Sequence, residues 1–185
     1  DRLRSRGLGD VYKRQVEESA KRFEKREKIK CYTGDYEEFL ENVDAVYIAS
    51  PNETHFEYAK KAIEAGKHVL SEKPLSFTKK ESEVLYTSAK EKGVVLMEAV
   101  KAAYCPGFQQ LINVAKSGKI GDIVDVEASF TRLADPLSRE RTDAEYGGAF
   151  LEFGPSVLVP VIKLMGKDYT SVTFDSIYDL SLIHI

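Results

Sequence analysis

Short apolar segments that alternate with amphipathic helical segments constrain the fold of this chain most strongly. Val43–Ala49 is almost continuously apolar, which is typical of a parallel strand buried on both faces. We expect three further strands in the same parallel sheet, Ile29–Tyr32, His68–Ser71 and Val94–Met97, and segments with apolar residues at helical spacing separate them. This strand–helix–strand order predicts an α/β fold of parallel βαβ units with right-handed crossovers.

The pattern changes after Glu98. Ile120–Leu133 and Tyr169–Tyr178 alternate apolar and polar residues, which predicts strands with one buried and one polar face. Gly147–Leu164 lies between them and is apolar and helical in character. We therefore expect a domain boundary near residues 99–104 and a second sheet that contains both alternating strands.

Composition excludes several classes of protein. The 185 residues are 43% apolar and 31% charged, which is typical of a soluble globular protein, and no apolar run approaches the length of a membrane span. A net charge of -3 argues against a general nucleic-acid binder. Cys31 and Cys105 form neither a disulfide framework nor a metal-ligand spacing. We expect a cytoplasmic protein without a metal site.

The two ends differ in composition from the rest. Residues 1–15 carry five basic and two acidic side chains, and residues 180–185 carry no charged side chain. Both resemble vector- or adaptor-derived translations, so we interpret them as non-native tails. A native flexible basic tail is the alternative for the first segment.

Polar clusters follow three of the predicted strands. They are Ser50-Pro51-Asn52, Glu72-Lys73-Pro74, and the pair Glu98 and Lys101. Each cluster alone is typical of a turn. Because ligands bind beyond the carboxyl ends of the strands in an open parallel sheet, the three together predict a crevice at one sheet edge.

Three motifs in the stretch Asp44–Ser76 carry a resemblance to a known family. They are the S-P-N-x-x-H run Ser50–His55, the A-G-K-H-V run Ala65–Val69 and the E-K-P run Glu72–Pro74. The stretch resembles the central signature of the Gfo/Idh/MocA oxidoreductases. The resemblance continues through Leu96–Ala99, Gly118–Gly121 and Gly147–Gly154.

The resemblance implies a partial Rossmann-type parallel sheet over residues 16–100, followed over residues 101–179 by the start of an α+β substrate or dimerisation domain. It implies an oxidoreductase that transfers a hydride between NAD or NADP and a sugar, a cyclitol or a similar polyol. The parent protein is expected to be a homo-oligomer that acts on a small molecule, with no nucleic-acid or membrane partner.

The resemblance also implies site residues. Those expected at the cofactor are Ser50, Pro51, Asn52, His55, Glu72 and Lys73. Lys73 is the expected catalytic lysine, which binds the reacting hydroxyl or carbonyl oxygen and exchanges a proton with it. A surface or helix-capping role is the alternative for His55, and the bond before Pro74 is one where a cis peptide is allowed.

Two positions depart from the family pattern. Glu152 stands where the family has an aspartate, and Ser156 stands where it has a histidine or tyrosine. Glu152 can accept a hydrogen bond from a sugar hydroxyl, whereas Ser156 cannot act as a base without a partner. We expect both at the substrate, with Glu152 as a second catalytic candidate; ordinary helix residues are the alternative. Lys101 is unusual for the family and is expected to bind an acidic substrate group.

The phosphate-cradling G-x-G-x-x-G motif is absent from the sequence, and Gly7 and Gly9 do not follow a predicted strand. We therefore expect an internal fragment that lacks its first βαβ unit. Two alternatives to an enzyme stay open: a cofactor-binding sugar sensor without turnover, which Ser156 favours, and an inert folding unit. For the enzyme, we expect five side chains to converge on one crevice: Asn52, Glu72, Lys73, Lys101 and Glu152.

Overall fold

A three-stranded parallel sheet forms the centre of the fold. The computed structural model describes residues 11–13, 17–28, 30–32, 35–133, 143, 145–175, 177–179 and 182–184. The sheet has the strand order β3 (Ala45–Ile48), β4 (His68–Ser71) and β5 (Leu96–Glu98), and both pairings are parallel. The predicted parallel βαβ organisation is therefore confirmed for these three strands.

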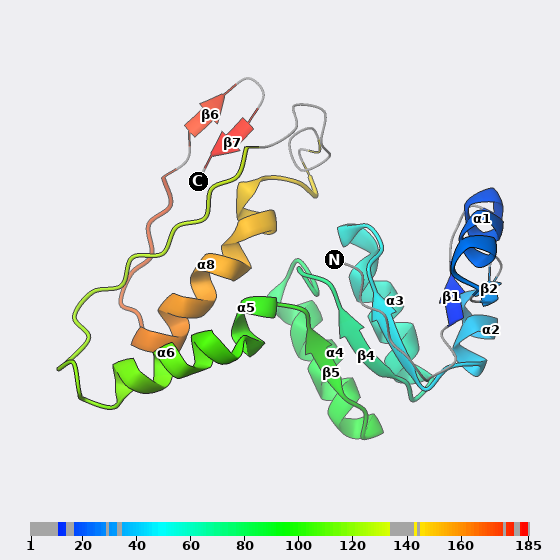
Figure 1. The fold of residues 1–185 in the computed structure, drawn as a ribbon, viewed down its shortest axis with the longest axis horizontal. Helices are drawn as coiled ribbons and strands as arrows, with labels where there is room; N and C mark the ends of the chain where they lie inside the picture. Colours follow the sequence, from blue (N-terminus) through cyan, green and yellow to red (C-terminus); the bar gives the residue numbers. More distant parts are fainter. Residues whose placement is uncertain are drawn as a thin grey trace.

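Helices α3 (His55–Glu64) and α4 (Lys79–Lys92) lie side by side and cover one face of this sheet (Figure 1). Val46 on β3 points into that core, whereas the next residue, Tyr47, is 57% exposed. The expectation that this strand is buried on both faces was wrong. An apolar run is compatible with burial on both faces of a strand, but it does not show that both faces are covered. Within the described residues, helices cover only one face of this sheet.

The core between the sheet and the two helices is continuous. It contains Tyr36, Phe39, Leu40, Val46, Ile48, Ala59, Ala62, Ile63, Val69, Leu75, Leu85 and Ala89. Ile63 and Leu85 are fully buried, and burying a side chain of this size contributes about 1.5–3 kcal/mol. This packing sets the positions of the loops that leave the strands.

Helix α2 (Tyr36–Glu41) joins the same core through Tyr36. The Tyr36 hydroxyl donates a hydrogen bond to the Tyr58 carbonyl oxygen at 3.2 Å, and the two rings lie 4.7 Å apart. Burial raises the pKa of Tyr36, and the nearby Tyr58 and Glu37 raise it further. The phenol therefore stays neutral and continues to donate.

Local sequence signals define the ends of α4. The Thr78 side chain accepts from the Glu81 amide, and the Glu81 carboxylate accepts from the Thr78 amide, which together form a capping box. Gly93 ends the helix with a left-handed φ of 68°. Because both ends are determined locally, β5 begins at a defined distance from the loop that carries Lys73.

The predicted strand Ile29–Tyr32 is observed as β2 (Lys30–Tyr32), but it does not join the central sheet. It pairs in parallel with β1 (Val11–Lys13), next to helix α1 (Glu17–Glu27). Placing this strand in the central sheet was therefore wrong. A short apolar run predicts an extended backbone and does not specify its partner. β1 lies inside the segment 1–15; residues 1–10, 14 and 15 of that segment lie outside the described residues.

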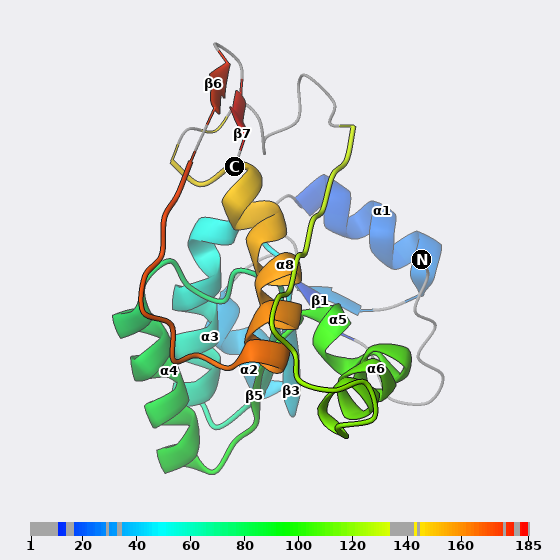
Figure 2. The same ribbon diagram turned by 90° about the vertical axis from the view of Figure 1, so that its left-hand side faces the viewer.

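Three helices form the second half of the described structure: α5 (Lys101–Tyr104), α6 (Pro106–Lys116) and α8 (Ala149–Met165). Both α5 and α6 pack against α8 (Figure 2). Helix α8 runs through Pro155 and Pro160, close to the predicted helix Gly147–Leu164. Within the described residues, no helix is long and apolar enough to cross a membrane.

The predicted second sheet differs from the observed structure. Residues 121–133 and 169–175 are extended but carry no strand pairing, and the antiparallel pair here is β6 (Ile177–Asp179) with β7 (Leu182–His184). The prediction that Ile120–Leu133 and Tyr169–Tyr178 are strands of one second sheet was therefore wrong. The alternation of apolar and polar residues predicts which side chains share a face. A β-strand also needs a neighbouring strand to which its backbone can hydrogen-bond, and the alternation does not provide one.

Both extended segments instead contact α8 through aromatic side chains. The rings of Phe130 and Phe153 stack at 4.8 Å, and those of Phe150 and Phe174 meet edge to face at 5.7 Å. The Arg132 guanidinium also lies 5.5 Å from the Phe153 ring centre. Figure 1 shows the two segments running along the helix. These contacts hold α8, whose first turn lies against Lys73 in the loop after β4.

Candidate active site

The loops that follow β3, β4 and β5 meet at one edge of the sheet. Ile48 is the register partner of Ser71, and Ser71 is the register partner of Glu98. Because the strands are parallel and end at the same level, the residues after them are neighbours. The loop after β4 is also anchored across the sheet, since the Leu75 amide donates to the Glu98 carboxylate at 3.0 Å.

Lys73 and Glu152 form the central contact of this edge. The Lys73 Nζ lies 3.2 Å from the Glu152 carboxylate and donates to the Glu152 carbonyl oxygen at 2.6 Å. The two side chains are only 19% and 26% exposed. Glu152 lies in the first turn of α8, and the peptide between Lys73 and Pro74 is cis. The structure thus confirms that these side chains meet, although 79 positions separate them in the chain.

A small cavity of about 100 Å³ adjoins this ion pair. Its lining comes from two segments, Pro51 and Asn52 after β3, and Tyr146, Gly147, Gly148, Leu151 and Glu152 at the start of α8. The Asn52 side-chain amide donates to the Tyr146 carbonyl oxygen at 3.4 Å. Asn52 and Glu152 therefore border one space, in agreement with the predicted crevice.

Tyr146 is a residue of this site that the sequence analysis missed. Its ring lies 5.3 Å from that of Phe77, so it anchors the segment before α8 to the loop after β4. A hydrogen bond with Glu145 raises the pKa of the Tyr146 phenol, and the charge of Glu145 acts in the same direction. In the sequence, only its position directly before the Gly147–Gly154 motif associates Tyr146 with the site. That position does not indicate which residues its side chain contacts.

Glu72 points to a different neighbour. Its carboxylate accepts a hydrogen bond from the hydroxyl of Tyr47, on the exposed face of β3. Its amide donates to the Ile48 carbonyl oxygen at 2.8 Å, which continues the pairing of β4 with β3. Glu72 is therefore held beside the sheet and makes no hydrogen bond or ion pair with Lys73 or Glu152.

His55 begins α3 and is only 1% exposed. Its Nδ1 lies 2.8 Å from the Pro74 carbonyl oxygen, and its Nε2 lies 2.9 Å from the Ser50 carbonyl oxygen. The Ser50 hydroxyl accepts from the Thr54 hydroxyl at 2.6 Å. His55 is thus placed between the two loops that carry Asn52 and Lys73.

Lys101 and Ser156 are not joined to this cluster by any polar contact. Lys101 is exposed at the start of α5, and its side chain makes no hydrogen bond or ion pair with any described residue. Ser156 is half-buried in α8, one turn after Glu152. The expected convergence on one crevice therefore holds for Asn52, Lys73 and Glu152, and is not observed for Lys101 or for the Glu72 carboxylate.

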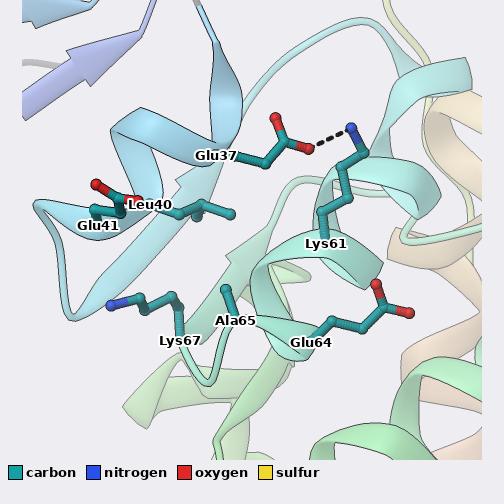
Figure 3. Close-up of a pocket in the computed structure, with 7 residues that line it drawn as sticks. All are labelled: Glu37, Leu40, Glu41, Lys61, Glu64, Ala65 and Lys67. Atoms are coloured by element: carbon teal, nitrogen blue, oxygen red, sulfur yellow. Dashed lines mark hydrogen bonds and ion pairs between the residues drawn. The ribbon is translucent and has the colours of Figure 1, made fainter.

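A larger surface pocket of about 430 Å³ lies elsewhere (Figure 3). Its lining residues are Glu37, Leu40, Glu41, Lys61, Glu64, Ala65 and Lys67. Lys67 directly precedes β4, so this pocket is at the opposite end of that strand from Lys73. It contains an ion pair in which Lys61 Nζ lies 2.7 Å from the Glu37 carboxylate. Among the described residues, no cluster of side chains is suited to hold a metal ion.

A parallel α/β sheet with polar loops beyond the carboxyl ends of its strands has the architecture of the Rossmann-type nucleotide-binding domains. A family model described as an oxidoreductase family with an NAD-binding Rossmann fold, Gfo/Idh/MocA, matches residues 4–100. The chain belongs to this family. The matched range begins within the segment 1–15 and ends at the predicted domain boundary.

Relatives with known names agree with this membership. A dTDP-3,4-didehydro-2,6-dideoxy-alpha-D-glucose 3-reductase of Actinomadura kijaniata is 38% identical over 153 residues, which are 80% of this chain and 46% of that protein. A scyllo-inositol 2-dehydrogenase (NADP(+)) of Bacillus subtilis is 36% identical over 131 residues, or 66% and 39% of the two chains. The chain therefore spans less than half the length of these relatives.

A solved structure has the same fold. The crystal structure of KijD10, a 3-ketoreductase from Actinomadura kijaniata, in complex with NADP and TDP-benzene, matches with a TM-score of 0.75 and 34% identity. The match covers 84% of this chain and 49% of that chain. The match therefore covers more of this chain than the range 4–100 of the family model.

Proposed function

We propose that the whole protein is an NAD(P)-dependent oxidoreductase that interconverts a secondary alcohol and a ketone on a sugar, a cyclitol or a similar polyol. The contact between Lys73 and Glu152 carries this proposal, because it places a positive charge and hydrogen-bond donors beside a cavity at the ligand-binding edge of the sheet. The names of the relatives support a polyhydroxylated substrate, since one reduces a deoxysugar nucleotide and another oxidises an inositol.

The residues at this edge suit the nicotinamide half of NAD or NADP. Asn52 offers an amide, Lys73 offers an ammonium and Glu152 offers an acceptor beside the same cavity, which matches an amide and ribose hydroxyls. Ser50, Pro51 and Glu72 belong to the same pair of loops, and His55 begins the helix that follows the first of them. The bound nicotinamide supplies the hydride acceptor in oxidation and the hydride donor in reduction. NADP in the complex of the 3-ketoreductase supports this assignment.

Lys73 is proposed to act on the substrate oxygen. An ammonium has three N–H donors, and one of them donates to the Glu152 carbonyl oxygen, while the Glu152 carboxylate forms an ion pair with Nζ. Another N–H is proposed to donate to a carbonyl oxygen of the substrate, which it polarises and to which Nζ passes a proton during reduction. In oxidation the same nitrogen receives the proton of the alcohol. Glu152 keeps Nζ in place and can accept a hydrogen bond from a neighbouring hydroxyl.

Ser156 does not share this proton transfer in the proposed mechanism. A serine hydroxyl needs an adjacent base to exchange a proton at neutral pH, and no described side chain hydrogen-bonds to the Ser156 hydroxyl. Lys101 is proposed to contact an acidic group of the substrate from the exposed start of α5. These assignments leave Lys73 as the principal acid–base group.

Residues 16–100 form the cofactor-binding domain, and residues 101–179 belong to the substrate domain. Segments 1–15 and 180–185 are additions to the native protein, although the family match from residue 4 and the pairing of β1 with β2 are features that a native segment would have. The whole protein is a cytoplasmic homo-oligomer with no nucleic-acid or membrane partner.

Steady-state kinetics of the whole protein test the function, with NAD and NADP and a panel of sugars, inositols and diols. Lys73→Ala is expected to lower the rate by about 10²–10⁴-fold, because a positioned acid–base group contributes about that much. Lys79→Ala is the matched control, since Lys79 is 90% exposed and, among the described residues, pairs only with Glu83. Wild-type rates in Lys73→Ala would contradict the mechanism. Clear cofactor binding without turnover on the panel would favour the sensor alternative.

A further inference from the structure

His55 is a buried titratable residue that the proposed reaction does not use. Both ring nitrogens face backbone carbonyl oxygens, Pro74 at 2.8 Å and Ser50 at 2.9 Å. A carbonyl oxygen can only accept a hydrogen bond, and a neutral imidazole donates from one nitrogen alone. Both contacts are hydrogen bonds only when both ring nitrogens carry hydrogen.

Among the residues that the structure describes, the two carbonyl groups have no other donor. Within the described residues, no backbone amide or other side chain donates to the Ser50 or Pro74 oxygen. A buried carbonyl without a donor is costly, and a lone pair of a neutral ring facing a carbonyl oxygen is repulsive. The imidazolium form satisfies both carbonyls with charge-assisted hydrogen bonds.

Two terms oppose the charged form. His55 is buried, and it begins α3, where the helix dipole disfavours a cation. His55 forms no ion pair with any described residue, including Glu72 and Lys73, which flank the contact with Pro74. The carbonyl dipoles on both sides of the ring are therefore its stabilising partners.

His68 provides an internal comparison. Its Nδ1 accepts a hydrogen bond from the Val95 amide at 2.9 Å, so this nitrogen carries no hydrogen and the ring is neutral. His55 and His68 thus differ in the direction of their contacts with the backbone. The difference follows from geometry and is directly measurable.

We propose that His55 is a positioning residue that, as an imidazolium, clamps the loop after β3 to the loop after β4. Ser50 lies two residues before Asn52, and Pro74 directly follows Lys73. The clamp thereby determines the separation of Asn52 from Lys73. His55 acts through these two residues and needs no contact with the cofactor. Its consequence for catalysis rests on the proposed function, whereas the clamp itself does not.

Nitrogen-15 NMR of the histidine rings in the 185-residue chain at neutral pH tests the protonation state. His55 is expected to show two protonated-type nitrogen resonances, and His68 one protonated and one unprotonated resonance. The variants His55→Gln and His68→Gln assign the signals. An unprotonated nitrogen in the folded-state spectrum of His55 would overturn the proposal.

Amide hydrogen exchange tests the clamp. His55→Gln offers donors from one nitrogen only and cannot reach both carbonyls, so faster exchange is expected at Leu75 and Thr54, in the two loops that the ring joins. His68→Gln is the matched control. Exchange in His55→Gln equal to that of the control would refute a clamp. If His55→Gln fails to fold, the ring NMR of the wild-type chain still decides the proposal.

Kinetics of the whole protein then separate this inference from the proposed function. His55→Gln is expected to reduce kcat more than it raises KM, because Lys73 is present but displaced. An unchanged kcat in an active protein would contradict the positioning role. Absence of wild-type turnover would defeat the proposed function and leave the NMR result standing.

Discussion

At the level of single residues, the ion pair of Lys73 and Glu152 is the feature from which the chemistry follows. The Lys73 side chain is about four-fifths buried and that of Glu152 about three-quarters buried, and the pair joins the loop after β4 to the first turn of α8. Glutamate is one methylene longer than the aspartate that the family pattern has at position 152. The longer side chain still reaches Nζ, so the departure at this position keeps the lysine partnered.

Removing the charge of Glu152 is expected to affect binding more than chemistry. In Glu152→Gln the carbonyl oxygen still accepts from Lys73, since that contact is made by the backbone. The variant loses the charge-assisted hydrogen bond that a substrate hydroxyl is proposed to donate to the Glu152 carboxylate. This loss should raise KM for polyol substrates by roughly tenfold, which corresponds to about 1.5 kcal/mol. Glu83→Gln, on the exposed face of α4, is the control. A fall in kcat as large as that of Lys73→Ala would mean that Glu152 takes part in the proton transfer.

The pocket of Figure 3 allows a prediction about pH. Hydrogen bonds with the Asp35 side chain and with Lys61 lower the pKa of Glu37 from 4.5 to about 2. A lowered pKa in the folded state means that this group contributes stability above pH 4.5, which is lost as the pH falls towards 2. NMR titration of Lys61→Met should show the Glu37 pKa moving up towards 4.5. Lys67→Met, which alters the same pocket without an ion pair, should leave it unchanged.

At the level of elements, α4 is the helix whose ends follow most directly from the sequence. Its capping box and left-handed Gly93 are local features, because each involves residues only a few positions apart in the sequence. Helix α8 is the opposite case. Its apolar composition predicts a helix, but only contacts with distant segments, such as Phe130 on Phe153, determine where its first turn lies.

Loss of the α4 cap should cost stability without altering the site. Thr78→Ala removes the side-chain acceptor for the Glu81 amide, and loss of such a cap costs about 0.5–2 kcal/mol. Urea unfolding measures the change. Thr87→Ala, the same substitution at an exposed position within α4, should stabilise slightly or have no effect because alanine favours helix. Equal destabilisation by both substitutions would contradict the role of the cap.

For the whole molecule, the decisive property is which parts of the cofactor can be bound. Tight binding of a dinucleotide uses backbone amides of a glycine turn at a helix N-terminus, and the sequence contains no G-x-G-x-x-G motif. Isothermal titration of NAD(H) into the 185-residue chain is therefore expected to show weak binding. The whole protein is the comparison. Tight, stoichiometric binding to this chain would mean that other residues hold the pyrophosphate.

The exposed sheet face is a second property of the whole molecule. Tyr47, Leu70 and Met97 lie on the side of β3, β4 and β5 opposite the helices, and they are 57%, 39% and 36% exposed. The prediction of strands buried on two faces rested on their apolar composition. Apolar strands can be buried on both faces, but the described residues cover only one face of this sheet.

The sequence by itself determined the helical and strand segments between residues 43 and 98, the ends of α4, and the residue types at the strand ends. These features depend on neighbours within a few positions, because capping, turn formation and apolar periodicity are local interactions. The motifs around Asn52 and Lys73 are also sufficient to indicate the family, since each motif is a short contiguous run of the chain.

Only the tertiary structure decided which distant groups meet. It paired β2 with β1, left residues 121–133 unpaired along α8, directed Glu72 to Tyr47, brought Tyr146 to the cavity, and placed the His55 ring between two carbonyls. Each of these contacts joins segments that are remote in the chain or depends on the direction of a side chain. Local patterns carry no information about either, since the partner is selected by the packing of the whole fold.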